Sequence, residues 1–156
     1  MSGIGADRLH LAWVSSAEAQ RFVEVVTDVS ASIHEQGKLD PDRFSLQLAA
    51  AEDTLSGEPL RWMVGKEVQI TTKGDVYGRQ WDEASYESIM DRTLEKEYHK
   101  NLIVQAIKDG CQMPRDISAR IGLDLQRVSF LLTDLEKARQ VEFKGMEACK
   151  PVFAAL

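Results

Sequence analysis

The sequence predicts a mainly α-helical protein with short β elements, in which a partial α/β segment at the N-terminus is followed by a winged helix-turn-helix-like module. Two observations support this fold class. Apolar residues recur at helical spacing in several stretches that begin at capping residues and end at glycines. In the last third, the sequence then predicts a short helix, a glycine turn, a longer helix and two short strands, which is the order of elements in a winged helix. We expect one domain over residues 1–80 and a second over residues 81–156, with a boundary near residues 78–84.

Residues 8–37 are expected to form a strand, a tight turn and a helix. The strand is expected to be short and buried, and Ser15 with Glu18 has the spacing of a capping box at the start of the helix. Gly37 stands where a left-handed cap would end that helix. The strand residues are Leu9, Leu11, Trp13 and Val14, and the apolar helix residues are Phe22, Val25, Val26, Val29 and Ile33.

Asp40 and Pro41 predict the start of the next helix, with aspartate as the N-cap and proline at the first helical position. Gly57 is expected to end it, and a further short helix restarts at residues 58–59. The inward-facing residues of the first of these helices are expected to be Phe44, Leu48 and Leu55.

Residues 67–78 are expected to form an extended piece and a turn, because Val68 and Ile70 alternate before a Thr-Lys-Gly-Asp sequence. Asp82 then predicts the start of a long helix that ends at Gly110. The helical pattern leaves open a break near Tyr98 or His99.

The module in the last third begins with a short helix over residues 115–121, followed by Gly122, which permits a sharp turn. A second helix is expected over residues 124–139, and two strands, residues 141–143 and 151–153, are expected to pair as a terminal hairpin. Ile117 and Ile121 are expected to pack the two helices together. The buried stripe of the second helix is expected to comprise Leu125, Val128, Leu131, Leu132 and Leu135.

The charge distribution argues against an obvious nucleic-acid binder. Residues 1–100 carry 11 Lys and Arg against 18 Asp and Glu, a net of −7, and residues 101–156 carry 8 against 7, a net of +1. DNA-binding proteins usually have a basic face. No apolar run approaches the roughly 18 residues that cross a bilayer, and no signal peptide is evident. We therefore expect a cytoplasmic protein without a membrane partner.

No motif in the sequence predicts a catalytic residue or a metal ligand. Ser15 and Ser16 lack the nucleophile-elbow pattern and are explained by helix capping. Cys111 and Cys149 are far apart, without CxxC or Cys/His spacing, and are expected to be reduced thiols. We expect no cofactor in this chain.

The second helix of the C-terminal module carries the candidate interaction residues Gln126, Arg127, Phe130 and Thr133. In a DNA-reading helix-turn-helix these positions would meet base edges, and Gln and Arg suit adenine and guanine. Asp124 and Asp134 lie on or near the same surface and would repel phosphates. An exposed Phe130 would suit a protein partner at least as well.

Residues 3–39, roughly a quarter of the chain, resemble the C-terminal end of the delta (iron–sulfur) subunit family of methyl-viologen-reducing hydrogenase, which is also found with heterodisulfide reductase. That family ends with a Gly-Ile, an acidic-Arg pair, an aliphatic strand, Trp-Val/Ile-Ser and an amphipathic helix. The matching residues run from Gly3-Ile4 through Asp7-Arg8 and Trp13-Val14-Ser15 to Phe22-Val23-Glu24-Val25-Val26.

The resemblance implies a role in electron transfer through a [2Fe-2S] cluster between a hydrogenase or formate dehydrogenase and a heterodisulfide-reductase-type partner. The family's cysteine ligands precede the matching stretch, and neither Cys111 nor Cys149 falls at a matching position. The cluster is therefore expected only in a longer parent protein. The chain is then interpreted as a C-terminal portion of such a subunit; a separate protein that retains only the last strand and helix is the other explanation.

Two functional hypotheses follow. In the first, the chain is a non-catalytic interaction module that docks an iron–sulfur subunit within a redox complex, with hydrogenase or heterodisulfide-reductase-type subunits as partners. In the second, it is a winged-helix transcriptional regulator that binds DNA through Gln126, Arg127 and Thr133. The acidic charge balance favours the first.

Overall fold

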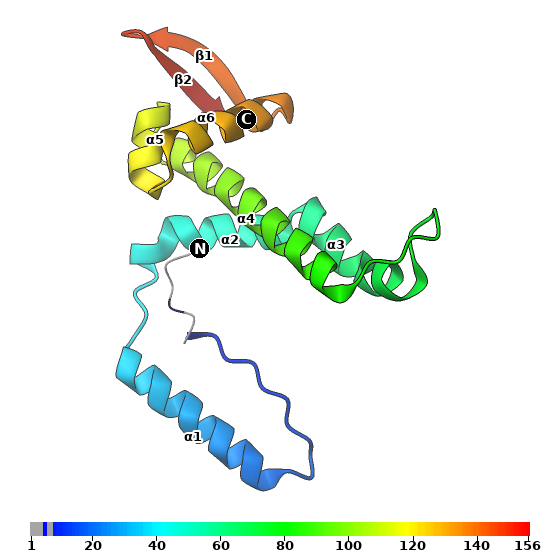
Figure 1. Cartoon of the computed structure of the whole chain (residues 1–156). Helices are drawn as coiled ribbons and strands as arrows, with labels where there is room; N and C mark the ends of the chain where they lie inside the picture. Colours follow the sequence, from blue (N-terminus) through cyan, green and yellow to red (C-terminus); the bar gives the residue numbers. More distant parts are fainter. Residues whose placement is uncertain (1–4, 6–7) are drawn as a thin grey trace. The chain divides into compact units, whose positions relative to one another are not determined.

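The computed structural model describes residue 5 and residues 8–156, and these residues form a mainly helical protein with a short antiparallel sheet (Figure 1). The chain divides into two compact units, Met1–Ser45 and Leu46–Leu156. The boundary expected near residue 80 lies within the second unit. Gly3, Ile4 and Asp7, which contribute to the family resemblance, lie outside the described residues.

Helix α1 (Ala19–Gln36) is the regular element of the first unit. The expected capping box is present in part, because the Ser15 backbone N–H donates a hydrogen bond to the Glu18 carboxylate at 2.8 Å, although the helix begins four residues after Ser15. The helix ends before Gly37, as predicted, and the Gly37 N–H donates to the Ile33 carbonyl. Gly37 has φ 68° and ψ −175°, so its cap is not the left-handed α conformation that was expected.

The strand expected at residues 9–14 is wrong: the segment is irregular, and Leu9 and Trp13 are more than four-fifths exposed. A strand needs a neighbour to bond its N–H and C=O groups. Among the described residues, the two strands at the C-terminus pair with each other. Side chains instead hold this segment, since the Arg8 guanidinium donates to the Gln36 and Gly37 carbonyls and Arg21 Nε donates to the Trp13 carbonyl.

A 3₁₀ turn (Asp42–Phe44) leads into helix α2 (Ser45–Ser56), which ends before Gly57 as predicted. The expected start is wrong: Pro41 is the N-cap of the 3₁₀ turn and the α-helix begins only at Ser45, because the Asp40 carboxylate caps the N–H of Asp42, at 3.1 Å, outside the α-helix. The expected inward face is wrong, because Leu48 and Leu55 are 38% and 65% exposed. The buried row runs every fourth residue instead, through Leu46, Ala50 and Thr54. Leu46 and Ala50 of this row belong to the core cluster, and the Thr54 hydroxyl accepts a hydrogen bond from the Asn101 amide at 2.9 Å.

Helix α3 (Glu58–Val68) continues into a π-helical turn (Gln69–Lys73), so the extended piece expected there is wrong. The Thr71 and Thr72 hydroxyls donate to the Glu67 and Val68 carbonyls four residues back, as threonine does within a helix. The turn that follows is present: the Gly78 N–H donates to the Asp75 carbonyl at 2.9 Å.

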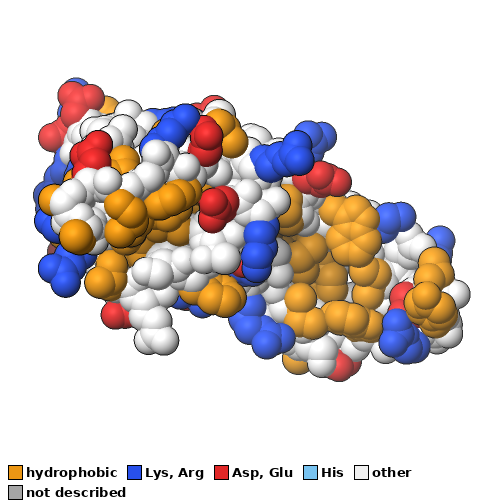
Figure 2. Space-filling view, turned by 90° about the horizontal axis from the view of Figure 1, so that it is seen from above, with side chains coloured by type: hydrophobic (Ala, Val, Ile, Leu, Met, Phe, Trp, Pro, Cys, Tyr) orange, Lys and Arg blue, Asp and Glu red, His pale blue; other side chains and the backbone are white. Residues whose placement is uncertain are grey.

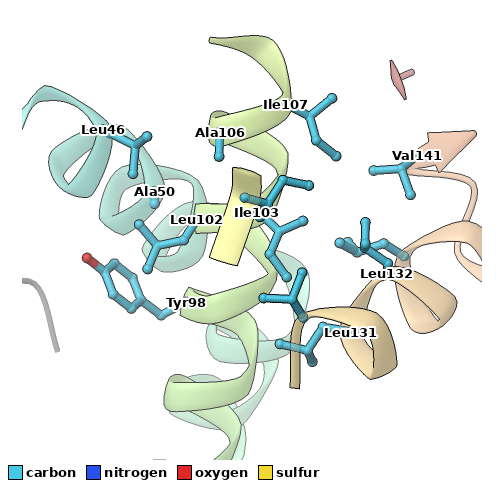
Figure 3. Close-up of a cluster of buried hydrophobic side chains, with 13 residues drawn as sticks. Leu46, Ala50, Tyr98, Leu102, Ile103, Ala106, Ile107, Leu131, Leu132 and Val141 are labelled. Atoms are coloured by element: carbon cyan, nitrogen blue, oxygen red, sulfur yellow. The ribbon is translucent and has the colours of Figure 1, made fainter. Parts of the chain in front are cut away.

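Helix α4 (Glu83–Lys108) is continuous through Tyr98 and His99, and Asp82 caps it by accepting from the Ser85 N–H. It contacts α3, α5, α6 and β2, and it lies between α2 and α6 in the core (Figures 1 and 3). The core is one cluster, which comprises Leu46, Ala50, Tyr98, Leu102, Ile103, Ala106, Ile107, Ile117, Val128, Leu131, Leu132, Leu135 and Val141.

The C-terminal elements follow in the predicted order: α5 (Pro114–Ile121), α6 (Leu125–Lys137), β1 (Val141–Glu147) and β2 (Lys150–Ala155). Gly122 has φ 71° and ψ 21°, the left-handed conformation that its turn requires. The strands form an antiparallel hairpin. The prediction that Leu125 belongs to the buried stripe of α6 is wrong, because Leu125 is 38% exposed at the start of the helix.

Candidate interaction face on α6

The four candidate residues all lie on the exposed surface of α6. The helix begins at a firm cap, because Asp124 Oδ2 accepts hydrogen bonds from the backbone N–H groups of Gln126 (2.9 Å) and Arg127 (3.1 Å). The opposite side of α6 supplies four core residues, Val128, Leu131, Leu132 and Leu135. Burial of that side fixes the rotation of the helix and holds Gln126, Arg127, Phe130 and Thr133 outward.

Phe130 is the most prominent residue of this face, with 58% of its surface exposed. Lys96 of α4 lies over its ring, with Nζ 6.0 Å from the ring centroid. The same ammonium forms a salt bridge with Asp134, at 2.7 Å from Nζ to Oδ2. The face is therefore built by two helices, and its central lysine is already paired.

Asp134 has a pKa below its ordinary value, first because the Lys96 ammonium donates a hydrogen bond to it and then because Lys96, Lys100 and Lys137 are nearby. The carboxylate thus remains ionised and offsets part of this positive cluster. Lys100 is also paired, with Glu97 Oε1 at 2.8 Å.

The remaining candidates differ in how far their side chains are already engaged. The Thr133 hydroxyl donates to the Ser129 carbonyl at 3.1 Å. The Gln126 and Arg127 side chains form no hydrogen bond or salt bridge with any residue that the structure describes. They are therefore the polar groups of this face that a partner can reach without breaking an existing bond.

His99 of α4 lies behind this face, with its side chain 13% exposed. Burial lowers the pKa of its imidazole below the ordinary value; Glu95 acts in the opposite direction, and the positive charge of Arg127 lowers it further. No local pattern in the sequence indicates this coupling between His99 and Arg127, because it depends on the packing of α4 against α6. Lys96 was missed for the same reason.

The described residues contain no group of three or more His, Cys, Asp or Glu side chains arranged to hold a metal ion. Cys111 is half-buried after α4, and Cys149 is exposed in the hairpin turn; both are free thiols. A hollow of about 580 Å³ beside the start of α4 is lined by carboxylates and threonines, among them Glu67, Asp82 and Thr71. The Thr71 hydroxyl is bonded to the backbone, and so offers no activated nucleophile.

No family model, no curated protein and no solved structure matches this chain. Within the described residues, none of the helices combines the length and the apolar character that crossing a membrane would demand.

Proposed function

We propose that this chain is a non-catalytic, cytoplasmic docking portion of an iron–sulfur electron-transfer subunit, and that α5, α6 and the hairpin form a winged helix-turn-helix module that binds protein. The observation that carries the docking role is the exposed Phe130, which lies beside the unpaired Arg127 and the Lys96–Asp134 salt bridge. Aromatic residues and arginine are enriched at protein interfaces and dominate their binding energy.

The charges around Phe130 favour a protein partner over DNA. Binding to the DNA backbone requires several cations that neutralise phosphates. Lys96 is paired with Asp134, and the hairpin Lys144 is paired with Glu142. On the face shown in Figure 2, Lys and Arg are interspersed with Asp, Glu and hydrophobic side chains and form no continuous stripe of described residues.

The redox partner is proposed from the resemblance of residues 3–39 to hydrogenase delta subunits. The irregular segment of the first unit is compatible with this origin, because Leu9, Leu11 and Trp13 have strand-like alternation and expose their side chains. The two cysteines do not fit a cluster site, since Cys111 and Cys149 stand apart from any other thiol and from a group of metal-ligating residues in the described chain. We assign the [2Fe-2S] cluster to a longer parent protein.

The test is affinity purification from a native anaerobic extract, with the intact protein as bait and mass spectrometry of the recovered proteins. We expect hydrogenase or heterodisulfide-reductase-type subunits, and we expect Phe130→Ala to reduce their recovery by about tenfold or more, as a hot-spot residue does. Tyr77→Ala is the matched control, because Tyr77 is another exposed aromatic side chain. Recovery without such subunits, or equal loss in both variants, contradicts the proposal.

A winged-helix DNA-binding regulator is the alternative function, because Gln126 and Arg127 are exposed near the start of α6 with unpaired side chains. It predicts duplex binding that weakens steeply with salt, and relaxed sequence specificity in Arg127→Ala. Binding to a panel of genomic fragments at low salt distinguishes the two functions. If one fragment binds much more tightly than the others, the result supports the DNA-binding function and contradicts the docking proposal.

A further inference from the structure

A groove of about 420 Å³ lies between the hairpin and the two helices of the C-terminal module, on a different side of α6 from Phe130. Its lining comes from the start of α5, the start of α6 and the hairpin turn. Leu125 and Ser129 of α6 line it, whereas Phe130 and Asp134 face Lys96 of α4.

The groove combines an apolar lining with two cations. Met113, Leu125 and Pro151 supply apolar surface, and Leu125 is exposed here instead of joining the buried stripe of α6. Arg115 and Lys150 supply the positive charge, and none of the lining residues is an Asp or Glu. Neither cation forms a hydrogen bond or salt bridge with the residues that the structure describes, although Lys150 lies across the hairpin from Glu147.

We propose that this groove binds a short acidic peptide segment of a partner protein, with an aliphatic side chain against Leu125 and carboxylates at Arg115 and Lys150. Complementary charge selects this occupant: the groove has two unpaired cations and no carboxylate in its lining. The apolar lining selects a peptide with a hydrophobic anchor over a bare anion, because an anion alone would leave Leu125 and Met113 uncovered. The proposal is independent of the redox partner proposed for the α6 face.

Nucleic acid fits this groove less well. A phosphate backbone would use the two cations but would leave the apolar lining without a contact. Arg115 and Lys150 are too few to account for strong backbone binding by themselves. Duplex DNA is therefore the competitor in the test.

The test is an NMR titration of the full chain, labelled with ¹⁵N, with a synthetic capped peptide of alternating Glu and Leu. We expect the amide resonances of Met113, Arg115, Leu125 and Lys150 to shift in a saturable, salt-sensitive manner. Peptides of alternating Lys and Leu, or of Glu and Ser, are expected to bind at least about tenfold more weakly because each lacks one of the two features. A second readout uses the exposed Cys149 on the groove, whose alkylation by iodoacetamide is expected to slow when the peptide is bound.

The variants separate the groove from general charge effects. Arg115→Gln with Lys150→Gln is expected to weaken peptide binding by about tenfold or more, as loss of paired interface charges does. Arg120→Gln with Lys144→Gln is the matched control, because it removes the same charge from α5 and from the hairpin at residues outside the groove. Leu125→Ser is expected to weaken binding without any change in charge.

Several results would overturn the proposal. These are the absence of shifts at the groove with the Glu and Leu peptide, equal binding by the double variant and its control, and a stronger response of the same amides to duplex DNA. Concentration-dependent shifts of these amides without peptide would also overturn it, because they would assign the groove to a second copy of the chain.

Discussion

At the scale of single residues, two buried tyrosines of α4 differ in whether the hydroxyl forms a hydrogen bond. Tyr86 and Tyr98 are each 4% exposed. The Tyr86 hydroxyl donates to the Met63 carbonyl at 2.6 Å and so ties α4 to α3, whereas the Tyr98 hydroxyl has no hydrogen-bond partner among the described residues.

We expect Tyr86→Phe to lower the free energy of unfolding by about 1–2 kcal/mol, because it removes the buried hydrogen bond between the Tyr86 hydroxyl and the Met63 carbonyl. Tyr98→Phe removes a hydroxyl that has no such partner and is expected to change stability by less than about 0.5 kcal/mol. Urea denaturation of both variants checks this pair. An equal cost in the two variants would show that the Tyr86–Met63 hydrogen bond does not stabilise the fold.

His99 gives the protein a pH-dependent stability. Its pKa in the folded protein is lowered by burial, while in the unfolded chain it is near the ordinary value of 6.5. The unfolded state therefore binds the proton more tightly. The stability that neutral His99 contributes is present above pH 6.5 and is lost as the pH falls from there toward the lower pKa of the folded state.

We expect the wild-type protein to lose stability as the pH falls through this window, and His99→Gln to show a shallower decline. Denaturation curves at a series of pH values above and below 6.5 measure the two slopes. Identical slopes in the two proteins would contradict the assignment to His99.

At the scale of elements, α6 depends on its N-cap, since Asp124 satisfies two N–H groups of the first turn. We expect Asp124→Ala to lower the free energy of unfolding by about 1 kcal/mol. Asp124→Asn is expected to retain most of the wild-type stability, because asparagine also caps helices well. Chemical denaturation compares the three proteins. Equal losses for Ala and Asn would mean that the carboxylate acts through charge instead of the cap.

Helix α4 is the element around which the second unit is built. Ile103 is fully buried between α4 and the other core helices, so Ile103→Ala is expected to cost about 3 kcal/mol through lost burial and a residual cavity. Val64→Ala on the exposed side of α3 is the control and is expected to cost less than about 0.5 kcal/mol. If Ile103→Ala lowers the free energy of unfolding as little as the control does, the packing around Ile103 does not stabilise the fold.

Most element boundaries could be predicted from the sequence because capping signals are local. Asp82 and Gly122 each act on neighbouring backbone groups, and each was assigned correctly. The strand at residues 9–14 could not be judged in this way, since a strand depends on a partner elsewhere in the chain. The prediction of the inward face of α2 was also wrong, because burial depends on which row of its side chains meets α4.

The candidate site was predictable only in part. The exposure of Gln126, Arg127, Phe130 and Thr133 follows from the position of the apolar stripe on α6. Lys96 lies 34 residues before Phe130 in the chain, and no local pattern indicates that they meet. Leu125 belonged to the periodic stripe but lines a groove instead, because the hairpin does not cover the start of α6.

At the scale of the whole molecule, the packed core belongs to one unit. Every residue of the core cluster lies in Leu46–Leu156, while α1 has no buried residue. We expect a fragment of residues 40–156, which retains Asp40 at the start of the helical segment, to unfold cooperatively with a Tm within about 4 °C of the full chain. Thermal unfolding followed by circular dichroism measures this. A fragment without a cooperative transition would show that the first unit is needed for the core.

The docking role of the intact protein is the central claim, and purification of the native protein from its source under anaerobic conditions tests it most directly. The measurement is the mass, the iron content and the subunit composition of the species that contains this sequence. Our account predicts co-purification with hydrogenase or heterodisulfide-reductase-type subunits, with iron bound in a parent chain larger than 17.5 kDa. An isolated, iron-free protein of 17.5 kDa that binds a specific DNA duplex would contradict it.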